Sequence, residues 1–353
     1  MSEIYYPPES ASQRAWIKSM DQYKEMYERS IQDSEGFWNE EAQNFVWFNK
    51  WDKVRDFNYN VKNGSIKIEW FRAAKTNITV NCLDRHLETR ADQIAILWEG
   101  NEPGENKTLT YRDLHARVCA FANVLKKHGV KKGDRVSIYM PMVLELAIAM
   151  LACARIGAVH SIVFGGFSAQ SLAERIVDSS CTCIITTDGS YRGSKPVPIK
   201  ANADEAMDIA AKKGVEVKVC IVAERVGDKI PVQMKKGRDY WWQDEMEGVS
   251  AEYEPVPMDA EEPLFILYTS GSTGKPKGVQ HSVGGYMVYT ALTHKYIFDY
   301  HDGDIWWCTA DIGWVTGHSY IIYGPLANGA TTIMFEGIPT YPDAGRFWEV
   351  VDK

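Results

Sequence analysis

Short apolar segments alternate with helical segments from about residue 82 onward, and few folds accommodate this pattern. Apolar runs at 135–140, 159–163 and 183–187 are separated by segments of helical periodicity. Parallel strands need such long crossovers, because each connection must return to the same end of the sheet. The pattern therefore predicts an α/β fold of mixed, mostly parallel sheets flanked by helices. Further strands are predicted at 217–222, 264–268, 305–308 and 331–335.

Local signals indicate where the helices begin and end. Thr110 followed by Asp113 is typical of a helix N-terminus, and Gly129 is placed to end that helix. A second helix is predicted to end before Gly157, and a third covers 169–179. The stretch 225–262 has mixed charge and few periodic apolar residues, so we expect a surface excursion there. The first helix is expected to bury Leu114, Val118, Phe121, Ala122 and Leu125.

The first 80 residues differ from the rest because they are rich in aromatic side chains. A helix is predicted over 12–29, with apolar and aromatic residues on one face. So many tryptophans in one short segment favour packing against a larger domain over independent folding. The face of the helix consists of Trp16, Met20, Tyr23 and Tyr27, and the other tryptophans are Trp38, Trp47, Trp51 and Trp70.

Composition excludes several functional classes. The 353 residues carry a formal net charge of −8, which argues against a general binder of nucleic acid or anionic membranes. The most apolar stretch, 140–159, is interrupted by Glu145 and Arg155 and is too short to cross a bilayer. Seven scattered cysteines and eight dispersed histidines lack metal-site or redox spacing, so we expect reduced thiols, a cytoplasmic protein and no protein-held transition metal.

A loop rich in Gly, Ser and Thr follows the predicted strand 264–268 and carries two lysines. Small residues let backbone N–H groups approach phosphate oxygens, and the hydroxyls add donors. Lys275 and Lys277 supply positive charge, so with Thr269 they are the groups expected to act on a bound polyphosphate. The predicted polyphosphate site consists of Thr269, Ser270, Gly271, Ser272, Thr273, Gly274, Lys275 and Gly278.

Two other interpretations of this loop must be considered. Clusters of this composition are often ordinary surface turns. The position after a buried strand favours a ligand site, because ligands of open α/β sheets bind at the carboxyl ends of strands. A Walker A loop fails on spacing, since Pro276 stands where its second Gly is required and no Ser or Thr follows a Gly-Lys pair.

The stretch 268–278 resembles the phosphate loop of the adenylate-forming superfamily, which includes acyl-CoA synthetases and luciferases. Further segments at 57–60, 68–71, 77–86 and 307–320 narrow the resemblance to the acetate–CoA ligase (acetyl-CoA synthetase) family. The resemblance runs across nearly the whole chain. It implies an N-terminal extension over 1–82 and part of the large AMP-binding domain over 83–353.

The resemblance also implies a two-step reaction. Acetate attacks the α-phosphate of ATP to give acetyl-adenylate and diphosphate, and the thiol of CoA then displaces AMP. ATP, acetate and CoA would be the small-molecule partners, with Mg²⁺ bound through the nucleotide. We expect neither a nucleic-acid nor a membrane partner. A propionate ligase, a phosphate-transferring NTPase and a non-catalytic binding fragment remain alternatives, and the oligomeric state is left open.

The family's CoA and acyl contacts can be carried over residue by residue. Arg192 matches the first of two arginines that hold the 3′-phosphate of CoA, whereas Lys195 replaces the second with a point charge. Thr340 stands where the family usually has Asn. His318 is expected to be structural, because attack by a carboxylate needs no proton removed. The implied CoA contacts are Phe164, Gly165, Gly166, Arg192, Lys195, Thr316 and Thr340, and the implied acyl pocket is Trp314, Val315 and Thr316.

The sequence stops at Lys353, within a predicted helix, whereas chains of the resembled family continue. We therefore expect a C-terminally truncated form with an incomplete large domain. It would lack the family's adenine-binding segment, hinge and catalytic lysine of the C-terminal domain. We expect residues 1–353 alone to be a poor or inactive catalyst.

Overall fold

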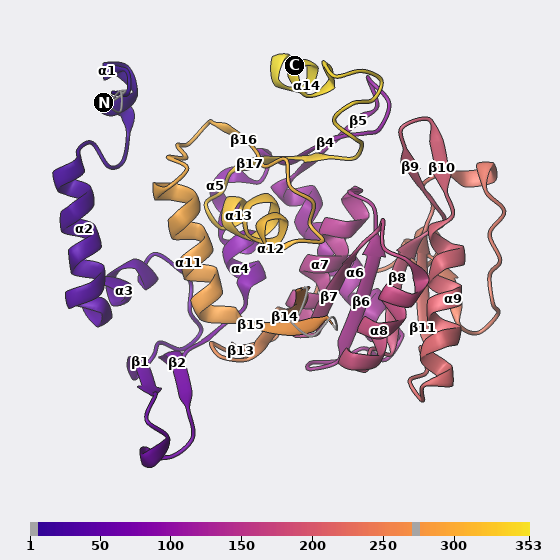
Figure 1. The fold of residues 1–353 in the computed structure, drawn as a ribbon, viewed down its shortest axis with the longest axis horizontal. Helices are drawn as coiled ribbons and strands as arrows, with labels where there is room; N and C mark the ends of the chain where they lie inside the picture. The colour runs from indigo at the N-terminus through magenta and orange to yellow at the C-terminus, as the bar shows by residue number, and fades with distance from the viewer. Residues whose placement is uncertain (1–5, 270–275) are drawn as a thin grey trace.

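Two β-sheets organise the computed structural model, which describes residues 6–269 and 276–353 (Figure 1). The larger sheet has seven strands in the order β12-β11-β8-β6-β7-β14-β15. Its neighbours are parallel except for the antiparallel pair β14–β15. The strands are β6 (Arg135–Met140), β7 (Val159–Phe164), β8 (Cys183–Thr187), β11 (Val219–Ala223), β12 (Asp239–Trp241), β14 (Pro263–Thr269) and β15 (Lys277–Ser282). The predicted α/β class is confirmed.

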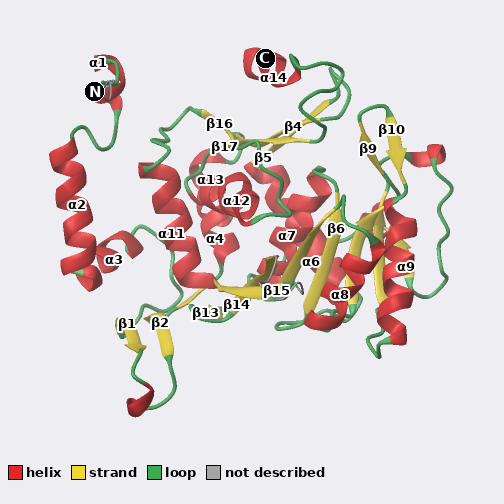
Figure 2. Cartoon of the chain, in the orientation of Figure 1, coloured by secondary structure: helices red, strands yellow, loops and turns green. Residues whose placement is uncertain are grey.

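Helices cover both faces of this sheet (Figure 2). α6 (Tyr111–Lys127) and α7 (Leu144–Ile156) share one apolar core, and α8 (Ala169–Ser179) and α9 (Ile199–Lys212) share another. Side chains alternate along β6, with Ile138 in the first core and Tyr139 in the second. The connection that leaves β6 therefore runs over one face, and the connection that leaves β7 runs over the other.

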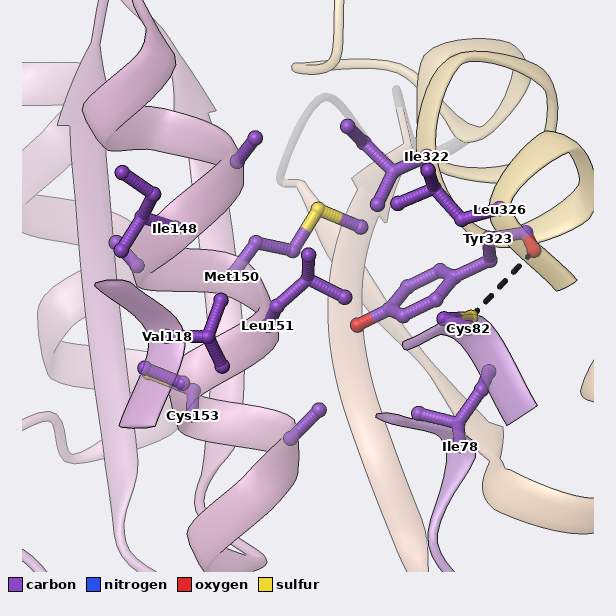
Figure 3. Close-up of a cluster of buried hydrophobic side chains, with 14 of the residues drawn as sticks. Ile78, Cys82, Val118, Ile148, Met150, Leu151, Cys153, Ile322, Tyr323 and Leu326 are labelled. Atoms are coloured by element: carbon purple, nitrogen blue, oxygen red, sulfur yellow. Dashed lines mark hydrogen bonds between the residues drawn. The ribbon is translucent and has the colours of Figure 1, made fainter. Parts of the chain in front are cut away.

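The first core extends beyond α6 and α7 to elements distant in sequence (Figure 3). α7 is buried on nearly all sides, because α4 (Ile78–Cys82) and the segment η4–α13 also pack around it. The Cys82 thiol lies 3.7 Å from the Tyr323 carbonyl oxygen and joins these two segments. η4 (His318–Tyr323) is a π-helical turn that continues into α13 (Gly324–Ala327).

The smaller sheet has the order β16-β17-β4-β5. In the sequence, α11 (Val283–Tyr296) precedes β16, and α14 (Arg346–Asp352) follows β17. Its strands are β4 (Ile94–Glu99), β5 (Asn106–Thr110), β16 (Ile305–Trp307) and β17 (Thr331–Phe335). The remaining elements are α1 (Glu9–Arg14), α2 (Met20–Gln32), α3 (Ser34–Ala42), β1 (Lys53–Asn58), η1 (Val61–Asn63), β2 (Lys67–Arg72), β3 (Lys75–Thr76), η2 (Asp84–His86), α5 (Leu87–Arg90), β9 (Ser190–Arg192), β10 (Lys195–Val197), η3 (Gly227–Lys229), α10 (Trp242–Met246), β13 (Met258–Asp259) and α12 (Val315–Gly317).

The N-terminal helix predicted over 12–29 is wrong in part, because the chain breaks between α1 and α2, which together cover most of that range. The Trp16 backbone N–H donates to Asp299 at 2.9 Å, and its indole N–H donates to the Tyr300 carbonyl at 2.8 Å. These tertiary bonds replace helical ones, and Ser19 then caps α2. The apolar face of α2 is exposed rather than packed. The expected packing is confirmed for four tryptophans that lie against the first core, namely Trp38, Trp47, Trp51 and Trp70.

The predicted surface excursion over 225–262 is also wrong in part. β12 extends the large sheet at its edge, and the Trp242 ring stacks on Phe121 with centroids 3.7 Å apart. Asp239 accepts from the Lys200 ammonium at 2.9 Å, and both side chains are buried. The stretch 225–262 therefore contains a few well-buried side chains that its sparse apolar periodicity did not predict.

The capping box that opens α6 is confirmed, and we expect Thr110→Ala to lower the free energy of unfolding by about 1 kcal/mol. The Thr110 hydroxyl accepts from the Asp113 backbone N–H at 3.1 Å, and the Asp113 carboxylate accepts from the Thr110 backbone N–H at 3.2 Å. Urea denaturation measures the change. Thr182→Ala, at an exposed loop position, is the control. An equal effect of both substitutions would contradict the capping role.

The cysteine prediction agrees with the structure, in which all seven thiols are free and six of them are buried. Burial raises the pKa of the Cys82 thiol to about 12 and that of Cys181 to about 11. Within residues 6–269 and 276–353, no helix has both the length and the apolar character needed to cross a bilayer.

Candidate ligand-binding site

A cavity of about 260 Å³ opens at the carboxyl ends of β6 and β7. The connections that leave these neighbouring strands run over opposite faces of the sheet and therefore diverge at the strand ends. This is the position at which open α/β sheets bind ligands. The lining residues are Pro141, Met142, Phe164, Gly165, Gly166, Ser190, Tyr191, Arg192, Val197, Asn202, Asp311, Glu336, Gly337 and Ile338.

The wall that follows β7 is held in place by local contacts. The Tyr139 hydroxyl donates to the Phe167 carbonyl at 2.6 Å, and Ser168 caps α8 by accepting from the Ser171 N–H. A Cβ atom at Gly165 would lie 3.2 Å from the Met140 carbonyl oxygen. The glycine therefore allows β6 and β7 to end close together at the cavity.

The basic segment after β8 forms a hairpin of β9 and β10, in which Arg192 lies opposite Lys195. Arg192 lines the cavity, whereas Lys195 is exposed outside its lining. Lys200 has only 2% of its side chain exposed and pairs with Asp204 at 2.7 Å and Asp239 at 2.9 Å. It therefore belongs to the core and not to the cavity lining.

Two carboxyl groups in the cavity wall were missed by the sequence analysis. Burial raises the pKa of Asp311, although its carboxylate accepts from the Gly313 N–H at 2.6 Å. Burial also raises the pKa of Glu336 to about 7, against the attraction of Arg225. Asp311 and Glu336 follow the ends of β16 and β17, and this position was the signal that could have identified them.

The predicted acyl-pocket residues lie beside the cavity rather than in its lining. Trp314 and Val315 are 52% and 43% exposed, and Thr316 is also exposed. The Trp314 ring meets the edge of Phe167 with centroids 6.4 Å apart. Thr340 is exposed and also lies outside the lining.

His318 is buried, and its Nδ1 lies 3.1 Å from the Trp314 carbonyl oxygen. Desolvation lowers its pKa to about 4, so the imidazole is neutral near pH 7 and Nδ1 carries the donated proton. This geometry agrees with the structural role expected for His318.

The predicted phosphate loop joins β14 to β15. Thr269 ends β14 opposite Lys277, and Gly278 lies opposite Tyr268. The Tyr268 hydroxyl donates to Asp178 of α8 at 2.7 Å, which fixes the strand just before the loop. The other predicted members lie outside the described residues, namely Ser270, Gly271, Ser272, Thr273, Gly274 and Lys275.

Across the described residues, no group of three or more His, Cys, Asp or Glu side chains is arranged to hold a metal ion. Mg²⁺ commonly binds through nucleotide phosphates, with few carboxylates from the protein.

Two family models match consecutive parts of the chain. Residues 23–82 match the model described as acetyl-coenzyme A synthetase N-terminus, and residues 83–353 match the AMP-binding enzyme model. The chain belongs to the AMP-binding enzyme family. The match includes every residue that lines the cavity.

Curated relatives agree with this assignment to the AMP-binding enzymes. Acetyl-coenzyme A synthetase of Brucella anthropi is 57% identical over 353 residues, which is 100% of this chain and 54% of the relative. The protein of the same name from Desulfatibacillum aliphaticivorans is 59% identical over 352 residues, or 100% of this chain and 53% of the relative. The chain thus spans about half the length of the curated relatives it matches.

Proposed function

We propose that this chain is the nucleotide- and coenzyme-binding part of an acetate–CoA ligase. One observation carries the proposal. Phe164, Gly165, Gly166 and Arg192 come from two separate connections, yet all four line one cavity at the topological switch point of the sheet. The same residues were expected to contact CoA on grounds of resemblance alone. The identity of 57–59% to acetyl-coenzyme A synthetases supports the same assignment.

In the proposed reaction, an acetate oxygen attacks the α-phosphorus of ATP, and diphosphate leaves to give acetyl-adenylate. The CoA sulfur then attacks the acetyl carbonyl carbon, and AMP leaves. Both steps bring anions together, so local positive charge and positioning supply much of the acceleration. Lys275, Lys277 and Thr269 would hold the departing phosphates. Magnesium bound with ATP would neutralise phosphate charge.

The coenzyme would enter through the cavity between β6 and β7. Arg192 would face the 3′-phosphate, with Lys195 beside it in the hairpin register. Gly165 and Gly166 would admit the flat adenine ring, because neither has a side chain to obstruct it. Trp314, Val315 and Thr316 would meet the acetyl group, while Thr316 and Thr340 would contact CoA.

We further propose the division of the chain into an extension over 1–82 and an AMP-binding domain over 83–353. A cytoplasmic location is proposed because all seven cysteines are free. Acetate, ATP and CoA are the proposed partners.

Calorimetric titration of the purified chain with ATP·Mg²⁺ and with CoA tests the proposal. We expect both to bind, and a folded chain that binds neither would overturn it. The identity of the nucleotide product distinguishes a ligase from a phosphate-transferring NTPase. A ligase releases AMP and diphosphate, whereas the NTPase releases ADP and phosphate. Comparing acetate with propionate for stimulation of diphosphate release by the full-length ligase, of which we propose this chain to be a part, tests the acyl specificity.

A further inference from the structure

Arg225 lies just behind the cavity and contacts two of its walls. It follows β11, and only 14% of its side chain is exposed. Its Nε donates to the Glu336 carboxylate at 2.7 Å. Its guanidinium carbon lies 4.9 Å from the centre of the Tyr191 ring. Glu336 and Tyr191 both line the cavity, whereas Arg225 does not.

The Arg225 side chain is held on its other sides as well. It pairs with Glu105 at 2.9 Å and lies 5.4 Å from the centre of the Trp98 ring. A planar guanidinium can hydrogen-bond to carboxylates at its edge and stack on aromatic rings with its faces at the same time. A lysine ammonium offers a single point charge and cannot reproduce this set of contacts.

The Arg225 backbone is fixed from behind by a buried carboxylate. Asp188 follows β8 and accepts from the backbone N–H groups of Arg225 at 2.7 Å, Val226 at 3.1 Å and Gly227 at 2.8 Å. The loop that carries Arg225 is therefore tied to the carboxyl end of β8. Arg225 in turn connects that anchored loop to the β9 wall and to the wall after β17.

We propose that Arg225 is a positioning residue for the coenzyme site, which sets the separation of the Tyr191 and Glu336 walls without contacting the ligand. The proposal rests on the proposed function, because it assumes that CoA occupies the cavity. Glu336 has 3% of its side chain exposed and depends on Arg225 for charge compensation. Loss of the guanidinium would therefore leave Glu336 without its cation and remove the stacking contact that holds the inner face of the Tyr191 ring.

The test compares CoA and ATP binding by calorimetry in the full 353-residue chain and in Arg225→Met. We expect the Kd for CoA to rise about thirtyfold, which corresponds to about 2 kcal/mol because each 1.4 kcal/mol is tenfold in Kd. The Kd for ATP should change by less than about twofold, because β8, β6 and β7 separate β11 from β14 and β15, the strands that flank the expected phosphate loop. A purely structural role would instead weaken the binding of both ligands.

Two further variants sharpen the result. Lys229→Met is the matched control, because Lys229 also lies 4.9 Å from the centre of the Tyr191 ring and donates to the Tyr191 hydroxyl at 2.8 Å, but is exposed on the surface. We expect it to raise the Kd for CoA by no more than about twofold. Arg225→Lys retains the charge and should show an intermediate loss of about fivefold. It also serves as the test if Arg225→Met does not fold.

The outcomes separate the two proposals. If the unsubstituted chain binds ATP but not CoA, the coenzyme assignment of the cavity fails and this inference fails with it. If the unsubstituted chain binds CoA and both Arg225 variants bind it equally well, only the positioning role is overturned. Equal losses in Arg225→Lys and Lys229→Met would also overturn it.

Discussion

Replacing Lys275 and Lys277 together with alanine should weaken ATP binding to this chain about a hundredfold. A hydrogen bond to a charged group contributes about 1.5–3 kcal/mol, and each 1.4 kcal/mol is tenfold in Kd. Lys277 begins β15 and is exposed, so its removal leaves no buried group unpaired. Calorimetric titration with ATP·Mg²⁺ measures the loss, and the Kd for CoA should remain within about twofold.

The double substitution Lys212→Ala and Lys213→Ala provides the matched control. These two neighbouring lysines are also exposed, but they lie at the end of α9. The control should reproduce any general effect of removing two positive charges from an acidic chain. If both double variants bound ATP as tightly as the original chain, the loop would not be the phosphate site.

Asp188→Ala should lower the free energy of unfolding by about 3 kcal/mol. The carboxylate is buried and accepts backbone N–H groups from Gly189, Arg225, Val226 and Gly227 at 2.6–3.1 Å. Each buried donor left without a partner costs about 1–3 kcal/mol, although relaxation and water entry recover part of the cost. Urea denaturation gives the change from the transition midpoint and slope.

Asp228→Ala is the control for this substitution. Asp228 lies in the same loop but is exposed, so its removal should change the free energy of unfolding by less than about 0.5 kcal/mol. Asp188→Asn retains one carbonyl acceptor and should lose less than Asp188→Ala. A loss below about 1 kcal/mol for Asp188→Ala would mean that the loop is held by other contacts.

The central βαβ units were predictable because local signals and tertiary packing agree there. The ranges predicted for β6, α8 and β8 match the structure at both ends. The strands β6 and β8 are recognisable because parallel strands are buried on both faces and therefore consist mostly of apolar residues. Gly157 adopts the left-handed conformation expected of a helix-ending glycine, which fixed the end of α7.

Prediction failed where side chains find distant partners. β15 was missed because its residues are mostly exposed and lack an apolar run, and its pairing with β14 supplies the order. β12 is only three residues long, so its sequence carries little periodic signal. The break before α2 depends on bonds from Trp16 to Asp299 and Tyr300, which no local pattern encodes.

The cavity was predicted only in part for a similar reason. Arg192 and the glycines after β7 belong to recognisable segments, whereas Asp311 and Glu336 reach the cavity from the smaller sheet. The relative position of two sheets follows from packing across the whole core. Arg225 was overlooked because it lies in a stretch interpreted as surface, and its burial depends on Glu336, Glu105 and Tyr191.

The strand order has a consequence for the growing polypeptide on the ribosome. β7 ends at Phe164, but its neighbour β14 does not begin until Pro263. At roughly 5–20 residues per second, the unpaired side of β7 waits several seconds for its partner. An open apolar strand edge is prone to intermolecular pairing during that interval. Molecular chaperones should therefore improve the soluble yield most when they engage the nascent chain between these two strands.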